Sequence, residues 1–321
     1  MKQVPRLNFA HLPTLIEEMG RLSDELKGPR IYVKRDDATG LALGGNKTRK
    51  LEFLVADALQ KGAQTLITAG AAQSNHCRQT AAAAAKFGLK CILVLNGARP
   101  DVMSANLLLD ELFGARIMWV ADRKDREHVQ EEAFKKLTED GEAPYFIPYG
   151  GSSPVGALGY AFAVQEALRQ RPKFDWYVFG TSSGGTHAGL TLGARLFGFR
   201  GKVLGISIDE SESWLKTRVS ALASDASELL GSRIEFTPDD VLANDSYCKA
   251  GYGVLTEAEK EAVRLVARTE GLLLDPVYTG RAAAGMIDLV RKGFFKPDEK
   301  ILFWNTGGQP ALFADTYQPF I

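Results

Sequence analysis

The 321-residue chain has few cysteines, few histidines, no excess of either charge and no long apolar run. Its three cysteines show no C-x-x-C spacing, so they indicate neither a disulfide framework nor a zinc site, and we expect no metal. Lys+Arg and Asp+Glu both number 39, which weighs against nucleic acid as the main ligand. The apolar run at 90–95 is far too short to cross a bilayer, and the N-terminus lacks the apolar core of a secretory signal. We therefore expect a soluble cytoplasmic protein.

Short apolar runs alternate with helical patterns through most of the chain, which is typical of an α/β fold. The predicted strands lie at 30–34, 64–68, 90–95, 116–120, 176–180, 202–207 and 300–304. These runs are continuously apolar, as expected for parallel strands that are buried on both faces. Helical periodicity at 51–59 and an alanine-rich stretch at 79–88 fall between them. Segment 210–255 is the least regular, and we expect a loop-rich cover there.

The first unusual strand-to-helix junction is "GGNKTRKLE" at 44–52. Lys47 stands at the predicted helix start, where the positive end of the helix dipole disfavours a protonated amine and lowers its pKa. Such an amine is suited to Schiff-base chemistry. A solvated basic helix face is the alternative explanation, and it accounts more easily for Arg49 and Lys50.

The second junction, at 68–80, places Gln73, Ser74, Asn75 and His76 between a strand and a helix. Side chains of serine and asparagine, together with free N–H groups at a helix start, can bind a carboxylate. Simple helix capping is the alternative. A serine hydrolase with Ser74 as nucleophile and His76 as base is disfavoured, because no G-x-S-x-G motif surrounds the serine.

The third junction, "FGTSSGGTHAG" at 179–189, is rich in glycine and hydroxyl groups. Glycines let backbone N–H groups approach an anion, and the next helix adds its dipole, so the loop can hold a phosphate. Neither the P-loop nor the G-x-G-x-x-G motif is present, and a tight turn with a serine cap is the alternative. The candidate phosphate ligands are Ser182, Ser183, Gly184, Gly185 and Thr186.

The last markers lie in the C-terminal third. "GYGVL" at 251–255 and "LLDPVYTG" at 273–280 place Tyr252 and Tyr278 at predicted turns, although either can be an ordinary half-buried aromatic. "NTGGQPALF" at 305–313 puts Thr306 after a strand, on the side of a parallel sheet where ligands bind.

Together, these motifs resemble the D-cysteine desulfhydrase and 1-aminocyclopropane-1-carboxylate deaminase family, and the resemblance runs in order from 35–37 to 311–313. Members of that family are pyridoxal-phosphate enzymes of the tryptophan synthase β-like fold, fold type II. The resemblance implies that Lys47 binds pyridoxal 5'-phosphate as a Schiff base, with Asn46 near the ring. It implies that Ser74 and Asn75 face the substrate carboxylate, with Asn75 also near the cofactor. It further implies that residues 182–186 hold the phosphate.

The resemblance also assigns residues to the remaining parts of the substrate and the cofactor. Tyr252 and Tyr278 would flank the substrate, and Gln73 and His76 would lie near it. Thr279 stands where members similar to the deaminase have a glutamate near the pyridine nitrogen. Thr279 and Thr306 match the desulfhydrase pattern better.

The function implied is β-elimination from a small amino acid, D-cysteine, to pyruvate, sulfide and ammonia. Deamination of 1-aminocyclopropane-1-carboxylate and L-cysteate sulfo-lyase activity remain alternatives, and segment 96–104 departs from both kinds of relative. A non-catalytic phosphate- or nucleotide-binding α/β protein is the alternative from another class. We expect two α/β domains, each a mostly parallel twisted sheet with helices on both faces: a large one from 1–51 and 161–321, and a smaller inserted one at 52–160. By family likeness we expect a homodimer.

Overall fold

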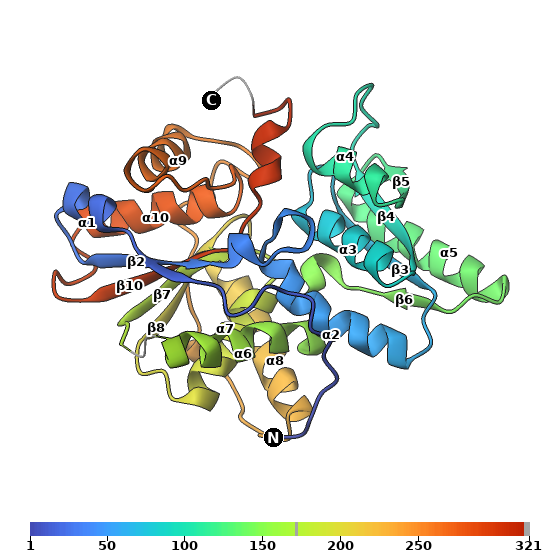
Figure 1. Ribbon diagram of the computed structural model, residues 1–321, viewed down its shortest axis with the longest axis horizontal. Coiled ribbons are helices and arrows are strands. Elements are labelled where there is room, and N and C mark those ends of the chain that lie inside the picture. Colours follow the sequence, from blue (N-terminus) through green and yellow to red (C-terminus); the bar gives the residue numbers. More distant parts are fainter. Residues whose placement is uncertain (171–172, 318–321) are drawn as a thin grey trace.

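The computed structural model describes residues 1–170 and 173–317, and two twisted sheets lie side by side in it (Figure 1). The larger sheet has the strand order β1-β2-β10-β7-β8-β9, and only β1 runs antiparallel to its neighbour. Its strands are β1 (Ile16–Glu18), β2 (Arg30–Arg35), β7 (Trp176–Thr181), β8 (Lys202–Ser207), β9 (Leu242–Asn244) and β10 (Lys300–Asn305).

The smaller sheet has the order β5-β4-β3-β6, and all its pairings are parallel. Its strands are β3 (Thr65–Ala71), β4 (Lys90–Asn96), β5 (Arg116–Val120) and β6 (Pro144–Phe146). The predicted fold class, α/β with two mostly parallel sheets, is confirmed. The strands that the prediction missed, β1, β6 and β9, have three residues each, too few to form a recognisable apolar run.

Helices cover both faces of each sheet (Figure 1). They are α1 (Gly20–Leu26), α2 (Asn46–Gln60), α3 (Asn75–Lys86), α4 (Ala105–Leu112), α5 (Arg126–Glu139), α6 (Pro154–Gln170), α7 (Gly185–Phe197), α8 (Glu212–Leu229), α9 (Glu257–Glu270) and α10 (Thr279–Arg291). Within the described residues, no helix is long and apolar enough to span a membrane.

The strand residues explain why both faces are covered. In β10, Ile301 and Phe303 pack in the cluster that includes α9 and α10, whereas Leu302 and Trp304 pack with α6 and α7 on the opposite face. Successive side chains of a strand point to opposite faces, so a continuously apolar strand requires a helix layer on each side. The smaller sheet follows the same rule, with α2 and α3 on one face and α5 on the other.

The expectation of a loop-rich cover at 210–255 is wrong for its first half, because α8 occupies Glu212–Leu229. Leu215, Val219, Leu222 and Ala226 form its buried stripe at helical spacing. Serine and aspartate residues between them have weak helix propensity, and they masked the pattern.

The predicted domain limits, at 52 and 160, fall inside α2 and α6. Helix α2 joins the two halves, because Leu51 and Leu54 belong to the core of the smaller sheet while Phe53 packs in the core with α6 and α8. The division into two domains at these residues stays a prediction. Of the predicted large domain, residues 171–172 and 318–321 lie outside the described residues.

Candidate active site

A cavity lies where the carboxyl ends of strands from both sheets meet. Its walls are built by the segments that follow β3, β6, β7 and β10 and by the start of α2. Ligands of parallel sheets bind at this edge because successive helices begin there. The predicted site residues that line it are Asn46, Lys47, Ser74, Asn75, His76, Ser182, Ser183, Gly184, Thr186, Tyr278 and Thr306. Their roles in binding and catalysis stay predictions.

The loop before α2 brings Lys47 into this cavity. Gly45 has φ +125°, and a β-carbon there would lie 2.5 Å from Nε2 of Gln79, so the chain needs glycine at this position. The amide of Asn46 then donates to the carbonyl of Thr306 (2.9 Å), which ties the helix start to the end of β10. The tight loop thus places the first turn of α2 in the wall of the cavity.

The Lys47 side chain is partly buried, and its amine has a lowered pKa. Burial lowers the pKa to about 8, and hydrogen bonding to Lys50 opposes this shift. The direction of the shift agrees with the prediction from the helix dipole, but desolvation is its largest cause in the structure. With this pKa, about one tenth of the amine is unprotonated at pH 7, far more than for an ordinary lysine, and that fraction can act as a nucleophile or a base.

Lys50 is a second amine in the same cavity. It is 1% exposed and donates from Nζ to the carbonyl of Gly150 (3.1 Å). Burial lowers the pKa of Lys50 well below its usual range, and the neighbouring Lys47 lowers it further. The expectation that Lys50 lies on a solvated helix face is therefore wrong. Two close amines without a carboxylate partner disfavour double protonation.

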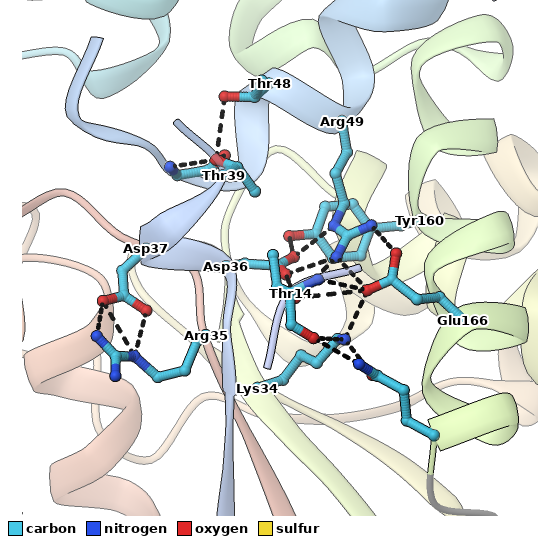
Figure 2. A network of polar contacts seen from close by, with 12 residues as sticks. Thr14, Lys34, Arg35, Asp36, Asp37, Thr39, Thr48, Arg49, Tyr160 and Glu166 are labelled. Carbon is cyan, nitrogen blue, oxygen red and sulfur yellow. Dashed lines mark hydrogen bonds and ion pairs between the residues drawn. The ribbon is translucent and has the colours of Figure 1, made fainter. Parts of the chain in front are cut away.

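Arg49, on the opposite side of the same helix turn, has a different environment (Figure 2). Its guanidinium donates two hydrogen bonds to Asp36 (2.8 Å each) and two to Glu166 (2.9 Å each). Tyr160 also donates to Asp36 (2.6 Å). Arg49 is 1% exposed, so the expectation of a solvated face is wrong here as well. This network joins α2 to the end of β2 and to α6.

The loop after β7 has the geometry that was expected of an anion site. Gly184 adopts φ +85°, and α7 begins at Gly185. Asn46 donates from Nδ2 to the hydroxyl of Thr186 (3.0 Å), which places the loop beside the start of α2. The hydroxyls of Ser183 and Ser152 are 2.7 Å apart. Hydroxyl-bearing residues and the start of α7 therefore form one wall of the cavity, as the phosphate prediction requires.

The junction after β3 shows both capping and access to the cavity. Ser74 is the N-cap of α3 and accepts from the Cys77 amide (3.2 Å), as the capping alternative proposed. His76 bonds through Nε2 to the hydroxyl of Thr68 (2.9 Å), which itself donates to the carbonyl of Ile147 (2.8 Å). Because the Thr68 proton is already donated, Nε2 of His76 carries its own proton.

The environment of His76 argues against the serine hydrolase interpretation. Burial, followed by the nearby Lys47 and Lys50 charges, lowers the pKa of His76 well below its usual range. The hydroxyl of Ser74 is occupied as a cap, and the ring of His76 is directed to Thr68 through its protonated nitrogen. The two residues thus do not form a nucleophile–base pair.

Two tyrosines form a hydrogen-bonded pair at the mouth of the cavity. The hydroxyls of Tyr252 and Tyr278 are 2.9 Å apart, and Tyr278 lines the cavity in front of Tyr252. Burial raises the pKa of both phenols well above 10. Both are therefore protonated at neutral pH, and one hydroxyl proton of the pair remains available to a ligand.

Three other predicted residues are placed away from the cavity surface. Gln73 donates to the carbonyl of Ser104 (3.1 Å) and accepts from the amide of Asn106 (2.9 Å). The hydroxyl of Thr279, 0% exposed, donates to the carboxylate of Asp275 (2.7 Å). Gly185 donates its N–H to the hydroxyl of Ser152 (3.0 Å). Their assignments to substrate or cofactor stay predictions.

Some lining residues were not predicted as site residues. They are Tyr149 and Gly150 in the segment after β6, Gly180 and Thr181 at the end of β7, and Lys50 in α2. Tyr149 and Gly150 lie shortly after β6, so recognition of the short run at 144–146 as a strand would have marked this segment. Arg126 places its guanidinium 5.0 Å from the Tyr149 ring and supports it from behind.

The charge of the cavity favours an anionic ligand. Among the described residues, two lysines line the cavity and no aspartate or glutamate does. The described residues also contain no group of His, Cys, Asp or Glu placed to hold a metal ion. Fold and site together define an α/β protein in which an amine with a lowered pKa and a wall rich in hydroxyl groups line a cavity between two mostly parallel sheets.

Comparison with known proteins identifies the class of such a site. The chain belongs to the family of pyridoxal-phosphate-dependent enzymes, whose sequence profile matches residues 7–307. D-cysteine desulfhydrases of Salmonella typhimurium and Salmonella typhi are each 43% identical to it over 330 aligned positions, covering 100% of this chain and 98% of each relative. The predicted family, enzyme class and cofactor are confirmed.

Solved structures agree with this family. A structure described as an ACC deaminase homologue superposes with a TM-score of 0.91 at 40% identity, covering 99% of this chain and 97% of that one. Threonine deaminase isoform 2 of Solanum lycopersicum has a TM-score of 0.66 at 18% identity, covering 92% of this chain and 79% of that one, and shows the shared fold.

The described residues fit pyridoxal 5'-phosphate. The amine of Lys47 is suited to an aldehyde, and the wall formed by residues 182–186 and the start of α7 is suited to a phosphate. Lys50 places a second amine in the cavity beside Lys47. No described carboxylate lines the cavity, so none repels a phosphate there.

Proposed function

We propose that this protein is a D-cysteine desulfhydrase, which converts D-cysteine and water to pyruvate, hydrogen sulfide and ammonia. The observation that carries the proposal is the buried Lys47 amine in a cavity that no described carboxylate lines. Identity of 43% with two D-cysteine desulfhydrases over the whole chain supports the choice of reaction. Thr279, in place of a carboxylate, also favours it over the deaminase.

We assign the proton transfers to the amine and the tyrosine pair. Lys47 would hold the cofactor at rest and accept the α-proton of the substrate during turnover, since its lowered pKa makes the unprotonated, basic form of the amine accessible near neutral pH. The cofactor, when bound, supplies the electron-withdrawing ring that delocalises charge from the α-carbon. Tyr278, backed by Tyr252, would donate a proton to the departing sulfur.

We assign binding to the two helix starts. Ser74 and Asn75 would orient the substrate carboxylate at the N-terminus of α3. The wall formed by Ser182 to Thr186 would bind the phosphate, and Asn46 would lie between it and the ring. Each group would therefore keep one anion in place while Lys47 acts between them.

The test measures the release of pyruvate, sulfide and ammonia from D-cysteine. L-cysteine, L-cysteate and 1-aminocyclopropane-1-carboxylate are assayed in parallel as alternative substrates. Release of sulfide and pyruvate from D-cysteine, at a kcat/KM above that for the other compounds, is expected. Formation of 2-oxobutyrate from the cyclopropane amino acid as the preferred reaction would identify a deaminase instead. A colourless protein without any of these activities would support a non-catalytic phosphate-binding protein.

We add three proposals. From family likeness we propose that the chain forms a homodimer, and from the sequence we propose that it acts in the cytoplasm and divides into the two predicted domains. Sedimentation equilibrium at two protein concentrations tests the first, and a monomer mass would contradict it.

A further inference from the structure

The side-chain amide of Asn75 is held in one orientation by two donors that bind its oxygen. Its Oδ1 accepts from Nδ2 of Asn106 (3.0 Å) and from Nη1 of Arg78 (3.3 Å). A guanidinium has donors and no acceptor, so this end of the amide must be the oxygen. The Nδ2 end is turned the other way and lies next to Gly308, where a β-carbon would be 2.6 Å from it. Asn75 lines the cavity, and because its Oδ1 is engaged, Nδ2 is the end of its amide that can donate to a ligand there.

Arg78 connects three parts of the site. Besides Asn75, it donates to Oδ1 of Asn106 (2.8 Å) and to the carbonyl of Gly44 (2.8 Å), in the loop that carries Lys47. The side chain is 0% exposed, and burial lowers its pKa to about 10, which leaves it charged at neutral pH. A positive charge thus lies directly behind the first turn of α3.

Asn106 is itself fixed by the junction after β3. Its backbone amide donates to Oε1 of Gln73 (2.9 Å), and its Nδ2 donates to the carbonyl of Gln73 (2.9 Å). Asn106 lies at the start of α4, immediately after segment 96–104, and is 0% exposed. The start of α4 is therefore clamped to the turn that contains Ser74 and Asn75.

We propose that Arg78 and Asn106 are positioning residues for the substrate carboxylate. They hold the amide of Asn75 with its N–H groups directed into the cavity, and the Arg78 charge adds attraction for an anion at the start of α3. Gln73 acts through Asn106 in this arrangement. The inference rests on the proposed function in one respect, the assignment of Asn75 to the carboxylate.

The test compares two ligands that differ by a carboxylate, alanine and ethylamine. Their dissociation constants are measured by calorimetry on the holoenzyme for the wild type, Asn106→Ala and Arg78→Lys, with exposed Arg116→Lys as the matched control. Both enantiomers of alanine are used. We expect the dissociation constant of alanine to rise about tenfold or more in both site variants, because a hydrogen bond to a charged group is lost. The dissociation constant of ethylamine should not change.

Kinetics provide a second readout. With D-cysteine, KM should rise about tenfold or more in the two variants, while kcat changes less and the visible absorption of the bound cofactor is unchanged. Asn106→Ala keeps the inference testable if Arg78→Lys does not fold. The inference would be overturned if the variants bound alanine as tightly as the wild type, or if their affinity for ethylamine fell as much as their affinity for alanine. It would also be overturned if the wild type bound neither enantiomer of alanine.

The two proposals can fail separately. A wild type that releases no pyruvate from D-cysteine would refute the proposed function. The ratio of alanine to ethylamine affinity does not depend on sulfide elimination, and it would still decide the role of Arg78 and Asn106.

Discussion

The first turns of α2 place three basic residues in two opposite environments. On one side, Arg49 is bonded to the carboxylates of Asp36 and Glu166. On the other side, the amines of Lys47 and Lys50 lie in a cavity that no described carboxylate lines. Burial disfavours charge in both places, and the presence or absence of carboxylates decides whether the pKa of the basic group rises or falls.

The comparison separates a structural from a reactive use of buried charge. Arg49 keeps its charge, because Asp36 and Glu166 outweigh desolvation and raise its pKa well above the usual value. Lys47 receives no such compensation, and its pKa falls to about 8. One ion-pair network thus anchors the helix, while the opposite side of the same turns holds an amine that loses its proton far more easily than an ordinary lysine.

The largest expected effect is on the reactive side. Lys47→Ala should lower turnover of D-cysteine at least about 10³-fold, because it removes the amine that holds the cofactor and accepts the proton. Pyruvate release measures turnover, and loss of the visible band that borohydride reduces in the wild type reports the missing bond. Lys61→Ala, at the exposed end of the same helix, is the control and should leave both unchanged. Retained turnover in Lys47→Ala would refute the mechanism.

On the structural side, Asp36→Ala should lower the free energy of unfolding by about 3–5 kcal/mol, because it leaves the buried Arg49 with one carboxylate partner and removes the acceptor of Tyr160. Urea denaturation at pH 7 measures it. The control is Glu261→Ala, which breaks the exposed pair with Arg291 and should cost less than about 1 kcal/mol. An equal decrease in the free energy of unfolding in the two variants would show that the Arg49 network does not anchor α2.

The lowered pKa of Lys47 predicts a pH dependence for cofactor capture by the apo-protein. Only the unprotonated amine attacks the aldehyde, so the rate should increase with pH and level off above about pH 8. Below that value the unprotonated fraction falls about tenfold per pH unit, and the rate should follow it. Stopped-flow absorbance at saturating pyridoxal phosphate measures the rate. A midpoint near 10 would mean that the amine is not desolvated.

The smallest expected effect concerns Lys50. Its hydrogen bond raises the pKa of Lys47, so Lys50→Met should move the midpoint of the capture profile to lower pH, by less than about one unit. The same stopped-flow series provides the comparison with the wild type. A shift to higher pH would show that Lys50 is the protonated partner and repels the Lys47 charge.

Much of the fold and part of the site followed from local sequence. Continuously apolar runs identified the longer strands, and the loops at 44–47, 73–76 and 182–186 were located because glycine, serine and asparagine stand out between such runs. The short β6 strand and the Tyr149 that follows it were missed, because three residues carry too little pattern.

The burial of Arg49 could not be predicted, because its partners are 13 and 117 positions away. Gln73 is a similar case. The family resemblance placed it near the substrate, which stays a prediction, but nothing in the sequence indicated that its amide is bonded to Ser104 and Asn106, about 30 residues later in the chain.

The sequence by itself determined which residues could perform chemistry: a lysine after two glycines, and hydroxyl-rich turns after strands. It did so because backbone conformation and strand ends depend on neighbouring residues. Only the tertiary structure decided which cations meet carboxylates and which do not. That choice depends on desolvation and on charges brought together from distant segments, and it separates the anchor at Arg49 from the amine at Lys47.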